Sequence, residues 1–187
     1  MFEFGVLDYK SMPNEDCSEV LLSGRSNAGK SSALNALAEN RKLARTSKTP
    51  GRTTEINFFR VNKYLRLLDL PGYGFAKSDK SKKKDWGPML GEYFQKRCCL
   101  KAVVVFMDIR HPLKEIDIEM IGLCRDFDIE FLPVLTKSDK VSNNENFKAR
   151  QQVQKQTGVK EVLTISALKD QGIKKLRDHL ISYSLYE

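Results

Sequence analysis

The sequence predicts a single α/β domain built on a mostly parallel sheet. Short runs rich in β-branched and aromatic residues alternate with segments whose apolar residues recur at helical spacing. Two of the runs, 56–61 and 64–70, are separated by only two residues, and such a short link joins antiparallel neighbours. The expected architecture is therefore six strands, one of them antiparallel, with five flanking helices over residues 1–187 and a short N-terminal extension at 1–16.

The strands follow from short apolar runs bounded by polar or turn residues. The run at 101–108 is apolar almost throughout, as is typical of a strand buried on both faces. Pro133 has no backbone N–H to give to a sheet, so we expect a bulge or locally broken pairing there. The six strands are expected at 19–23, 56–61, 64–70, 101–108, 129–136 and 161–166.

The helices follow from apolar stripes that face the core. One further helix is expected to begin at Ser142, where Glu145 completes a capping-box pattern. The stripes are Leu34, Leu37 and Ala38; Trp86, Met89, Leu90, Tyr93 and Phe94; Ile116, Met120, Leu123 and Phe127; and Ile173, Leu176 and Leu180.

Composition sets limits on function. The net charge of +8 raises the expectation of an anionic partner such as nucleic acid. The longest apolar run, 102–107, is far too short to cross a bilayer, and the first ten residues do not form a signal peptide. The four cysteines show no zinc spacing, which favours reduced thiols and a cytoplasmic location.

The segment "GRSNAGKS" fits the phosphate-binding P-loop pattern G-x-x-x-x-G-K-[ST] between an expected strand and an expected helix. Its backbone N–H groups would surround phosphate oxygens, Lys30 would reach the β- and γ-phosphates, and the Ser31 hydroxyl would bind Mg²⁺. The residues expected to contact the nucleotide here are Gly24, Arg25, Ser26, Asn27, Ala28, Gly29, Lys30, Ser31 and Ser32.

Two later motifs also end strands. In "DLPG" (Asp69, Leu70, Pro71 and Gly72), Asp69 would hold the Mg²⁺ shell through water and the Gly72 N–H would donate to a γ-phosphate.

In "TKSD", the Asp139 carboxylate would accept two hydrogen bonds from guanine, a donor pair that adenine lacks. Lys137 would pack its stem over the ring and brace the P-loop. The last strand ends at "SAL", where the Ala167 N–H could meet the guanine O6. The residues expected at the base are Thr136, Lys137, Ser138, Asp139, Ile165, Ser166 and Ala167.

The polar segment 44–59 has the character of a switch loop whose threonine joins the Mg²⁺ shell when γ-phosphate is present. Thr53 and Thr54 both qualify by chemistry. The nucleotide contacts expected in this loop are Gly51, Arg52, Thr53, Thr54 and Glu55.

Five motifs in order, "GRSNAGKSS", "TPGRT" followed by "INFF", "DLPGYGFA", "TKSDK" and "SALK", resemble the EngB family of bacterial GTPases, also called YihA or YsxC. The likeness extends from about Cys17 to about Leu180. It implies a Ras-like GTPase fold without an added domain, GTP or GDP with Mg²⁺, and a role in large ribosomal subunit assembly, with a link to cell-division septation. It also places the Mg²⁺ threonine at Thr53.

Tyr73 stands where many GTPases carry a glutamine that orients the attacking water, so we expect slow intrinsic hydrolysis. The catalytic contributors are then Lys30, Thr53, Gly72 and Asn27. Asn27 either helps to hold K⁺, which supplies transition-state charge, or only bonds the loop. Tyr73 either packs locally or reaches the water, and a ribosomal partner is a further way to complete the site.

Five lysines follow the "DLPG" motif within eight residues: Lys77, Lys80, Lys82, Lys83 and Lys84. We expect them to contact the ribosomal RNA or proteins of the large subunit under control of the γ-phosphate, although such runs can also be solvated loops. We expect a monomer without a membrane partner. Two alternatives stay open, a P-loop ATPase or small-molecule kinase and a guanine-nucleotide-dependent scaffold or membrane-associated switch with incidental hydrolysis.

Overall fold

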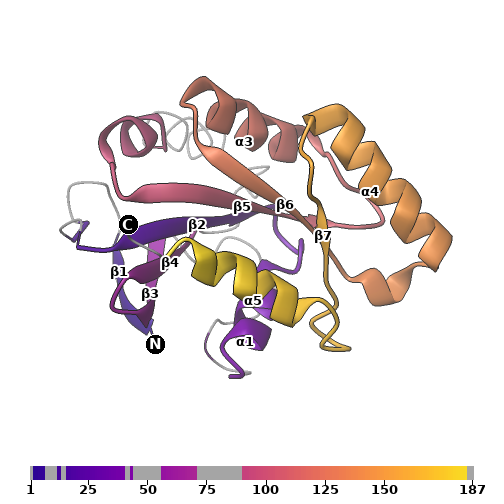
Figure 1. The fold of residues 1–187 in the computed structure, drawn as a ribbon, viewed down its shortest axis with the longest axis horizontal. Coiled ribbons are helices and arrows are strands. Elements are labelled where there is room, and N and C mark those ends of the chain that lie inside the picture. The colour runs from indigo at the N-terminus through magenta and orange to yellow at the C-terminus, as the bar shows by residue number, and fades with distance from the viewer. Residues whose placement is uncertain are drawn as a thin grey trace.

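The computed structural model describes residues 2–6, 12–13, 16–40, 43, 56–70 and 90–184. In this part of the chain a seven-stranded sheet lies between two layers of helices (Figure 1). The strands are β1 (Phe2–Val6), β2 (Ser18–Gly24), β3 (Ile56–Asn62), β4 (Leu65–Asp69), β5 (Leu100–Asp108), β6 (Glu130–Thr136) and β7 (Leu163–Thr164). The helices are α1 (Lys30–Leu37), the helix at 90–96, α3 (Glu115–Asp126), α4 (Asn143–Thr157) and α5 (Ile173–Ser182), with a 3₁₀ turn at Ser138–Lys140.

The strand order is β1-β3-β4-β2-β5-β6-β7. Strand β3 is antiparallel to both of its neighbours, β1 and β4, while β4, β2, β5, β6 and β7 are mutually parallel. The mostly parallel sheet with one reversed strand is therefore confirmed. Because parallel strands share one carboxyl edge, the ends of β2, β4, β5 and β6 converge, and loops at that edge are where ligands bind in such folds.

The sheet has one strand more than the six expected. The N-terminal residues do not form only an extension, because β1 adds to the free edge of β3 in an antiparallel pair. In the sequence Phe2, Phe4 and Val6 alternate with Glu3 and Gly5, which is the period-2 pattern of a strand. Glu3 on this strand accepts hydrogen bonds from Arg60 at 2.9 Å and from Arg66 at 3.0 Å, which ties β1 to β3 and β4.

Of the two expectations at Pro133, the bulge is wrong, and the locally broken pairing is confirmed on the β7 side. Strands β5 and β6 pair without a register shift, with Pro133 opposite Val105. The Leu135 carbonyl accepts from the Ile165 N–H on the β7 side, so Pro133, two residues earlier, faces the same side. Pairing with β7 begins only at Val134. The missing N–H therefore lies beyond the end of the β7 ladder and costs no hydrogen bond.

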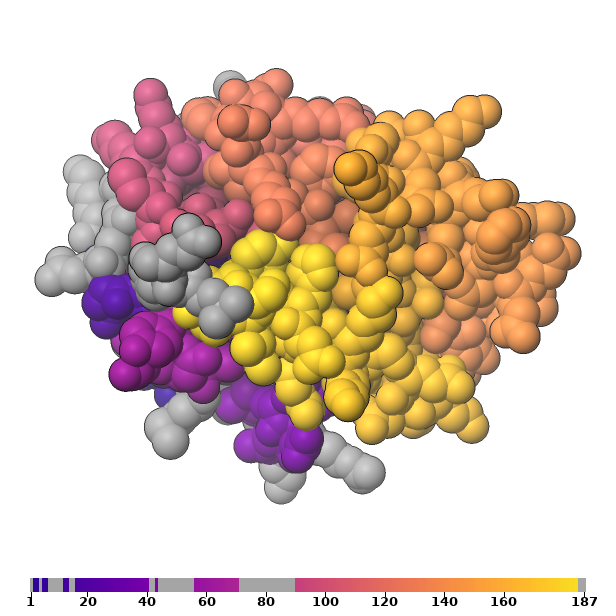
Figure 2. Space-filling model, viewed as in Figure 1, coloured from indigo at the N-terminus to yellow at the C-terminus, as the bar shows by residue number. Residues whose placement is uncertain are grey.

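The two faces of the sheet have separate cores. Helix 90–96, α3 and α4 cover one face, with Tyr93, Met120 and Val153 buried there. Helices α1 and α5 lie side by side on the other face (Figure 2). Leu34 and Leu176 are buried beneath them.

The stripe expected on α5 is confirmed, since Ile173, Leu176 and Leu180 are buried there, while the stripe on α3 differs from expectation. The buried side chains of α3 are Asp117, Met120, Ile121 and Cys124. Phe127, expected on the stripe, is 36% exposed and meets Phe94 edge-on. At α4 the expected capping box is confirmed, since the Glu145 N–H donates to Ser142 Oγ and the Ser142 N–H donates to the Glu145 carboxylate.

The described helices include none with the length and apolar character that a bilayer crossing requires. All four cysteines are free thiols; Cys98 is exposed, and Cys17, Cys99 and Cys124 are buried.

Candidate functional site

The P-loop segment connects β2 to α1 at the carboxyl edge of the sheet. β2 ends at Gly24 and α1 begins at Lys30. The chain turns through left-handed conformations at Asn27 (φ 62°) and Gly29 (φ 92°), and the Ala28 N–H donates to the Arg25 carbonyl at 3.0 Å. Asparagine and glycine are the residues that adopt this region most readily, which explains their presence here.

Gly24 is required by close packing against the neighbouring strand. A Cβ atom at Gly24 would lie 2.9 Å from the carbonyl oxygen of Phe106 on β5. Only glycine allows the start of the loop to lie so near the backbone of β5.

Lys30 and Asp69 form a buried ion pair between the P-loop and the end of β4. Their residues are 7% and 8% exposed. The Lys30 ammonium also donates to the Leu70 carbonyl oxygen at 2.5 Å. The pair arises because β2 and β4 are parallel neighbours with Leu22 opposite Asp69. The two residues that the sequence assigns to phosphate and to Mg²⁺ therefore lie together, with Ser31 next in the chain.

Thr136 joins the end of β6 to the P-loop. Its hydroxyl donates to the Ala28 carbonyl oxygen at 2.5 Å, and its Oγ1 also lies 3.2 Å from the Met107 carbonyl oxygen. The threonine is 3% exposed. This contact fixes the end of β6 against the P-loop.

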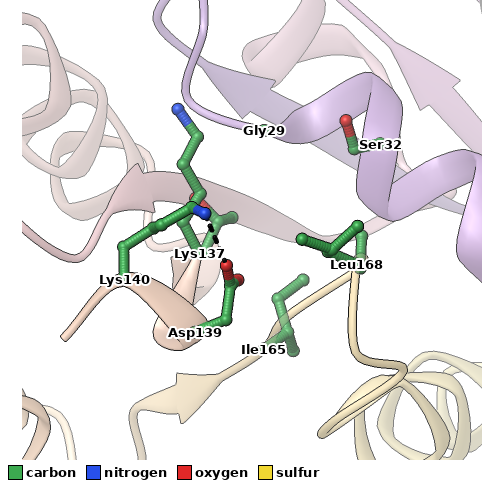
Figure 3. A pocket seen from close by; sticks show the side chains of 9 residues that line it. Gly29, Ser32, Lys137, Asp139, Lys140, Ile165 and Leu168 are labelled. Atoms are coloured by element: carbon green, nitrogen blue, oxygen red, sulfur yellow. Dashed lines mark ion pairs between the residues drawn. The ribbon is translucent and has the colours of Figure 1, made fainter. Parts of the chain in front are cut away.

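Lys137 extends from the same strand end toward the P-loop (Figure 3). It has a left-handed backbone (φ 59°), and its ammonium donates to the Asn27 carbonyl oxygen at 2.7 Å and to the Asp108 carboxylate at 2.9 Å. Bracing of the P-loop by this lysine, expected from the sequence, is present in the structure.

Asp139 lies opposite Ser166, which follows β7. The Ser166 hydroxyl donates to Asp139 Oδ1 at 2.6 Å, and the Lys140 ammonium lies 3.3 Å from Oδ2. The hydrogen bond from Ser166 is the main cause of a lowered pKa at Asp139, with a smaller contribution from Lys140. The carboxylate therefore stays ionised at neutral pH and is an acceptor.

A pocket opens between these elements (Figure 3). Ile165 and Leu168 give it an apolar side, and Asp139 gives it an acceptor. An apolar slot with an anionic acceptor at one end suits a planar ring that carries N–H donors on one edge. The lining residues are Gly29, Ser32, Thr136, Lys137, Asp139, Lys140, Ile165, Ala167 and Leu168.

The structure thus brings together the described parts of three sequence motifs: 24–32, 69–70 and 136–139, with 165–167 beside them. The remaining expected site residues lie outside the described residues. They are Gly51, Arg52, Thr53, Thr54, Glu55, Pro71, Gly72 and Tyr73, together with Lys77, Lys80, Lys82, Lys83 and Lys84.

Three residues near the site were not predicted. Asp108 contacts Lys137, Lys140 contacts Asp139, and Leu168 lines the pocket with 73% of its surface exposed. Asp108 carried a usable signal, because it is an acid at the carboxyl end of a central strand, as Asp69 is.

Comparison with known proteins identifies the family. The family model described as "50S ribosome-binding GTPase" matches residues 19–137. A probable GTP-binding protein EngB of Edwardsiella ictaluri (strain 93-146) is 49% identical over 178 residues, covering 92% of this chain and 82% of the relative. A probable EngB of Escherichia coli O139:H28 (strain E24377A / ETEC) is 48% identical over 184 residues, covering 96% and 87%.

Solved structures agree with the fold. The crystal structure of a probable GTP-binding protein EngB superposes with a TM-score of 0.73 at 22% identity, covering 89% of this chain and 98% of that one. Era in complex with MgGDPNP and a segment of 16S ribosomal RNA superposes with a TM-score of 0.67 at 18% identity, covering 90% and 57%. These relatives and the family model together show that the chain belongs to the EngB family of P-loop GTPases, which bind guanine nucleotide and hydrolyse GTP.

Proposed function

We propose that the chain is a switch, controlled by GTP and GDP, that acts in assembly of the large ribosomal subunit. The observation that carries the proposal is the meeting of Asp139, Lys137 and the P-loop in one pocket. The family description names a 50S ribosome-binding GTPase. By family resemblance, the proposed role extends to normal cell-division septation. A protein that acts on ribosomal subunits would be located in the cytoplasm.

In the proposed site the P-loop residues 24–32 surround the phosphates. Asp139 accepts from the guanine ring N–H and exocyclic amine, as its low pKa and its position at the pocket allow. The Lys137 stem packs over the ring while its ammonium stays on the Asn27 carbonyl. The Ala167 N–H meets the guanine O6, with Ile165 and Ser166 beside it. Residues 51–55 complete the contacts.

The donor set fits Mg²⁺, which prefers oxygen ligands and keeps several waters. Asp69 is 8% exposed and is paired with Lys30, the residue that precedes Ser31 in the chain. We propose Ser31 and Thr53 as direct ligands and Asp69 as a ligand through water. Bound Mg²⁺ would neutralise charge on the phosphates.

The Lys30–Asp69 pair suggests how nucleotide changes the site. In this structure the charges of Lys30 and Asp69 compensate each other, and the Lys30 ammonium also donates to the Leu70 carbonyl oxygen. Phosphate can replace Asp69 as the partner of Lys30, which frees the carboxylate for the metal shell. Asp69 and Leu70 lead directly into Pro71 and Gly72, so the exchange connects the phosphate with the segment that carries Gly72 and the lysines.

Hydrolysis is proposed to be slow in the isolated protein, because Tyr73 replaces the usual water-orienting glutamine. Lys30, Gly72 and Thr53 would stabilise charge on the transferred phosphoryl group. Asn27 is proposed to help hold K⁺ as an additional charge.

The proposed partner surface is the lysine run 77–84, which directly follows the γ-phosphate motif. A polyanion such as ribosomal RNA would be bound through its phosphates, so binding should weaken steeply with salt. The alternative is a guanine-nucleotide-dependent scaffold or membrane-associated switch whose hydrolysis is incidental. Unlike the proposed switch, this alternative does not require ribosome binding to depend on the bound nucleotide.

Co-sedimentation with large ribosomal subunits tests the proposal, in GTP analogue, in GDP and without nucleotide, over a salt series. The switch predicts more binding with the GTP analogue than with GDP, and a smaller salt dependence when the five lysines are changed to glutamine. A matched control changes Lys148, Lys155, Lys160, Lys169 and Lys174, which lie on or beside α4 and α5, to glutamine. Equal binding in all three nucleotide states would refute the switch.

A further inference from the structure

The carboxylate of Asp108 is buried at the carboxyl end of β5, beside the nucleotide site. Its side chain is 3% exposed. It accepts four hydrogen bonds, three from Arg110 and one from Lys137. The Arg110 contacts are backbone N–H and Nε to Oδ1, at 3.1 and 2.9 Å, and Nη2 to Oδ2, at 2.6 Å. Arg110 and Lys137 together lower the pKa of Asp108 below its usual range, against the effect of burial.

Lys137 is held from two sides. Its ammonium lies 2.9 Å from Asp108 Oδ2 and 2.7 Å from the Asn27 carbonyl oxygen. Asp108 is thus connected to the P-loop through Lys137. The lysine side chain is 32% exposed, so without partners it would sample many rotamers.

The charge arrangement requires the carboxylate. Both cations, Arg110 and Lys137, share Oδ2 of Asp108. Asp139, which also acts electrostatically on Arg110, is already bound by Ser166 and Lys140. Removing the charge of Asp108 would leave Arg110 and Lys137 facing each other, and like charges at this separation repel.

We propose that Asp108 is a positioning residue for nucleotide binding that acts through Lys137. It fixes the ammonium on the P-loop before nucleotide arrives, so that the lysine stem is already placed over the base. The Lys137 side chain then loses its rotamer freedom when the protein folds, so that nucleotide binding does not carry this entropic cost. The proposal rests on the role given to Lys137 in the proposed function.

Asp108→Asn gives the sharpest test. If the amide oxygen takes the Oδ1 position and keeps the backbone N–H and Nε of Arg110, the amide NH₂ takes the Oδ2 position and faces the Lys137 ammonium. We expect affinity for GDP to fall about tenfold, mainly through faster dissociation, because a charge-assisted hydrogen bond is lost. Arg110→Gln is the matched control, since it removes the other partner of the same carboxylate, and we expect affinity within about twofold of the parent.

A double-mutant cycle separates action through Lys137 from a general structural role. Lys137→Met keeps most of the stem and removes the ammonium, and it should weaken GDP binding by itself. Combining it with Asp108→Asn should then weaken binding no further. Thermal unfolding of each nucleotide-free variant shows whether it is folded.

A measurement on the unsubstituted protein covers the case in which Asp108→Asn does not fold. Reductive methylation of the nucleotide-free protein, followed by mass spectrometry, should modify Lys137 severalfold more slowly than the exposed Lys140. Equal rates would contradict the proposal.

The outcomes are distinguishable. If Lys137→Met leaves GDP affinity unchanged, the proposed role of Lys137 fails and this inference fails with it. If Lys137→Met weakens binding while Asp108→Asn does not, only the inference fails. Two results would show that Asp108 acts on the structure of the turn and not through Lys137. One is a fold-loss of GDP affinity in the double variant that equals the product of the two single losses. The other is a loss in Arg110→Gln as large as that in Asp108→Asn.

Discussion

Gly29 of the P-loop packs directly on Thr136 at the end of β6. A Cβ atom at Gly29 would lie 3.0 Å from Thr136 Oγ1 and 3.1 Å from its Cβ, and Gly29 has a φ of 92°. The same threonine hydroxyl donates to the Ala28 carbonyl oxygen. The phosphate loop and the strand that leads to the base-binding residues therefore form one packed unit.

Gly29→Ala should accordingly impair nucleotide binding. The new methyl group would push the P-loop from Thr136 and strain a left-handed backbone, so we expect GDP affinity to fall at least ~100-fold. Fluorescent GDP titration measures the change. Gly158→Ala is the control, because Gly158 also has a positive φ of 69° but nothing within 4 Å of its added Cβ. It should cost about 1 kcal/mol of stability and leave affinity unchanged.

Glu19 should be a principal contributor to stability. It is fully buried and accepts from Arg97 at 2.7 and 2.9 Å, from Tyr93 at 3.0 Å and from Arg66 at 3.2 Å. Glu19→Ala would leave buried cations without their partner, so we expect the free energy of unfolding to fall by about 3–5 kcal/mol.

Urea denaturation tests this expectation against a matched exposed pair. Glu92→Ala removes the partner of Lys96 on the surface of helix 90–96, where both side chains are about half exposed. It should cost no more than ~0.5 kcal/mol. Similar losses in the two variants would contradict the assignment of Glu19.

Asp117 should make stability depend on pH in the direction opposite to most carboxylates. Burial raises its pKa to about 6, although the Lys114 N–H and the charge of Arg25 oppose the shift. The folded state therefore holds this proton more tightly than the unfolded state. Its stabilising contribution is complete below about pH 4 and is lost as pH rises through about 6.

Asp117→Asn removes that dependence. Relative to the parent protein, the variant should gain up to about 3 kcal/mol of unfolding free energy between about pH 4 and pH 7.5. Urea denaturation across this range measures the difference. A constant difference between the two proteins would show that Asp117 does not titrate as described.

Asn27 should determine the response of hydrolysis to monovalent cations. GTP turnover should be about tenfold faster in K⁺ than in Na⁺, and Asn27→Gly should remove the difference. Glycine keeps the left-handed backbone (φ 62°) and the carbonyl that Lys137 contacts, so only the side chain is lost. Equal turnover of the parent protein in the two salts would exclude the K⁺ role.

The sequence predicted most of the fold, and its motifs lie in the described segments that meet at the carboxyl edge of the sheet, because both depend on local signals. Strands such as 101–108 have strong apolar runs, and 24–31 is a motif whose spacing is set by its ligand. The pairing of β1 with β3 and the side on which Pro133 lacks a partner were not predicted, because each depends on a neighbouring strand that local sequence does not specify. Asp108 was missed because it belongs to no motif, although its place at the end of a central strand was a usable signal.

Asp139 is proposed to select guanine, and the affinities of the Asp139→Asn variant for GDP and XDP test this selection. Xanthine carries an oxygen where guanine has its exocyclic amine, so an amide donor should suit it better than a carboxylate. We predict that the parent protein prefers GDP and that Asp139→Asn reverses the order, with a change of at least ~100-fold in the ratio of the two affinities. An unchanged ratio would contradict the account.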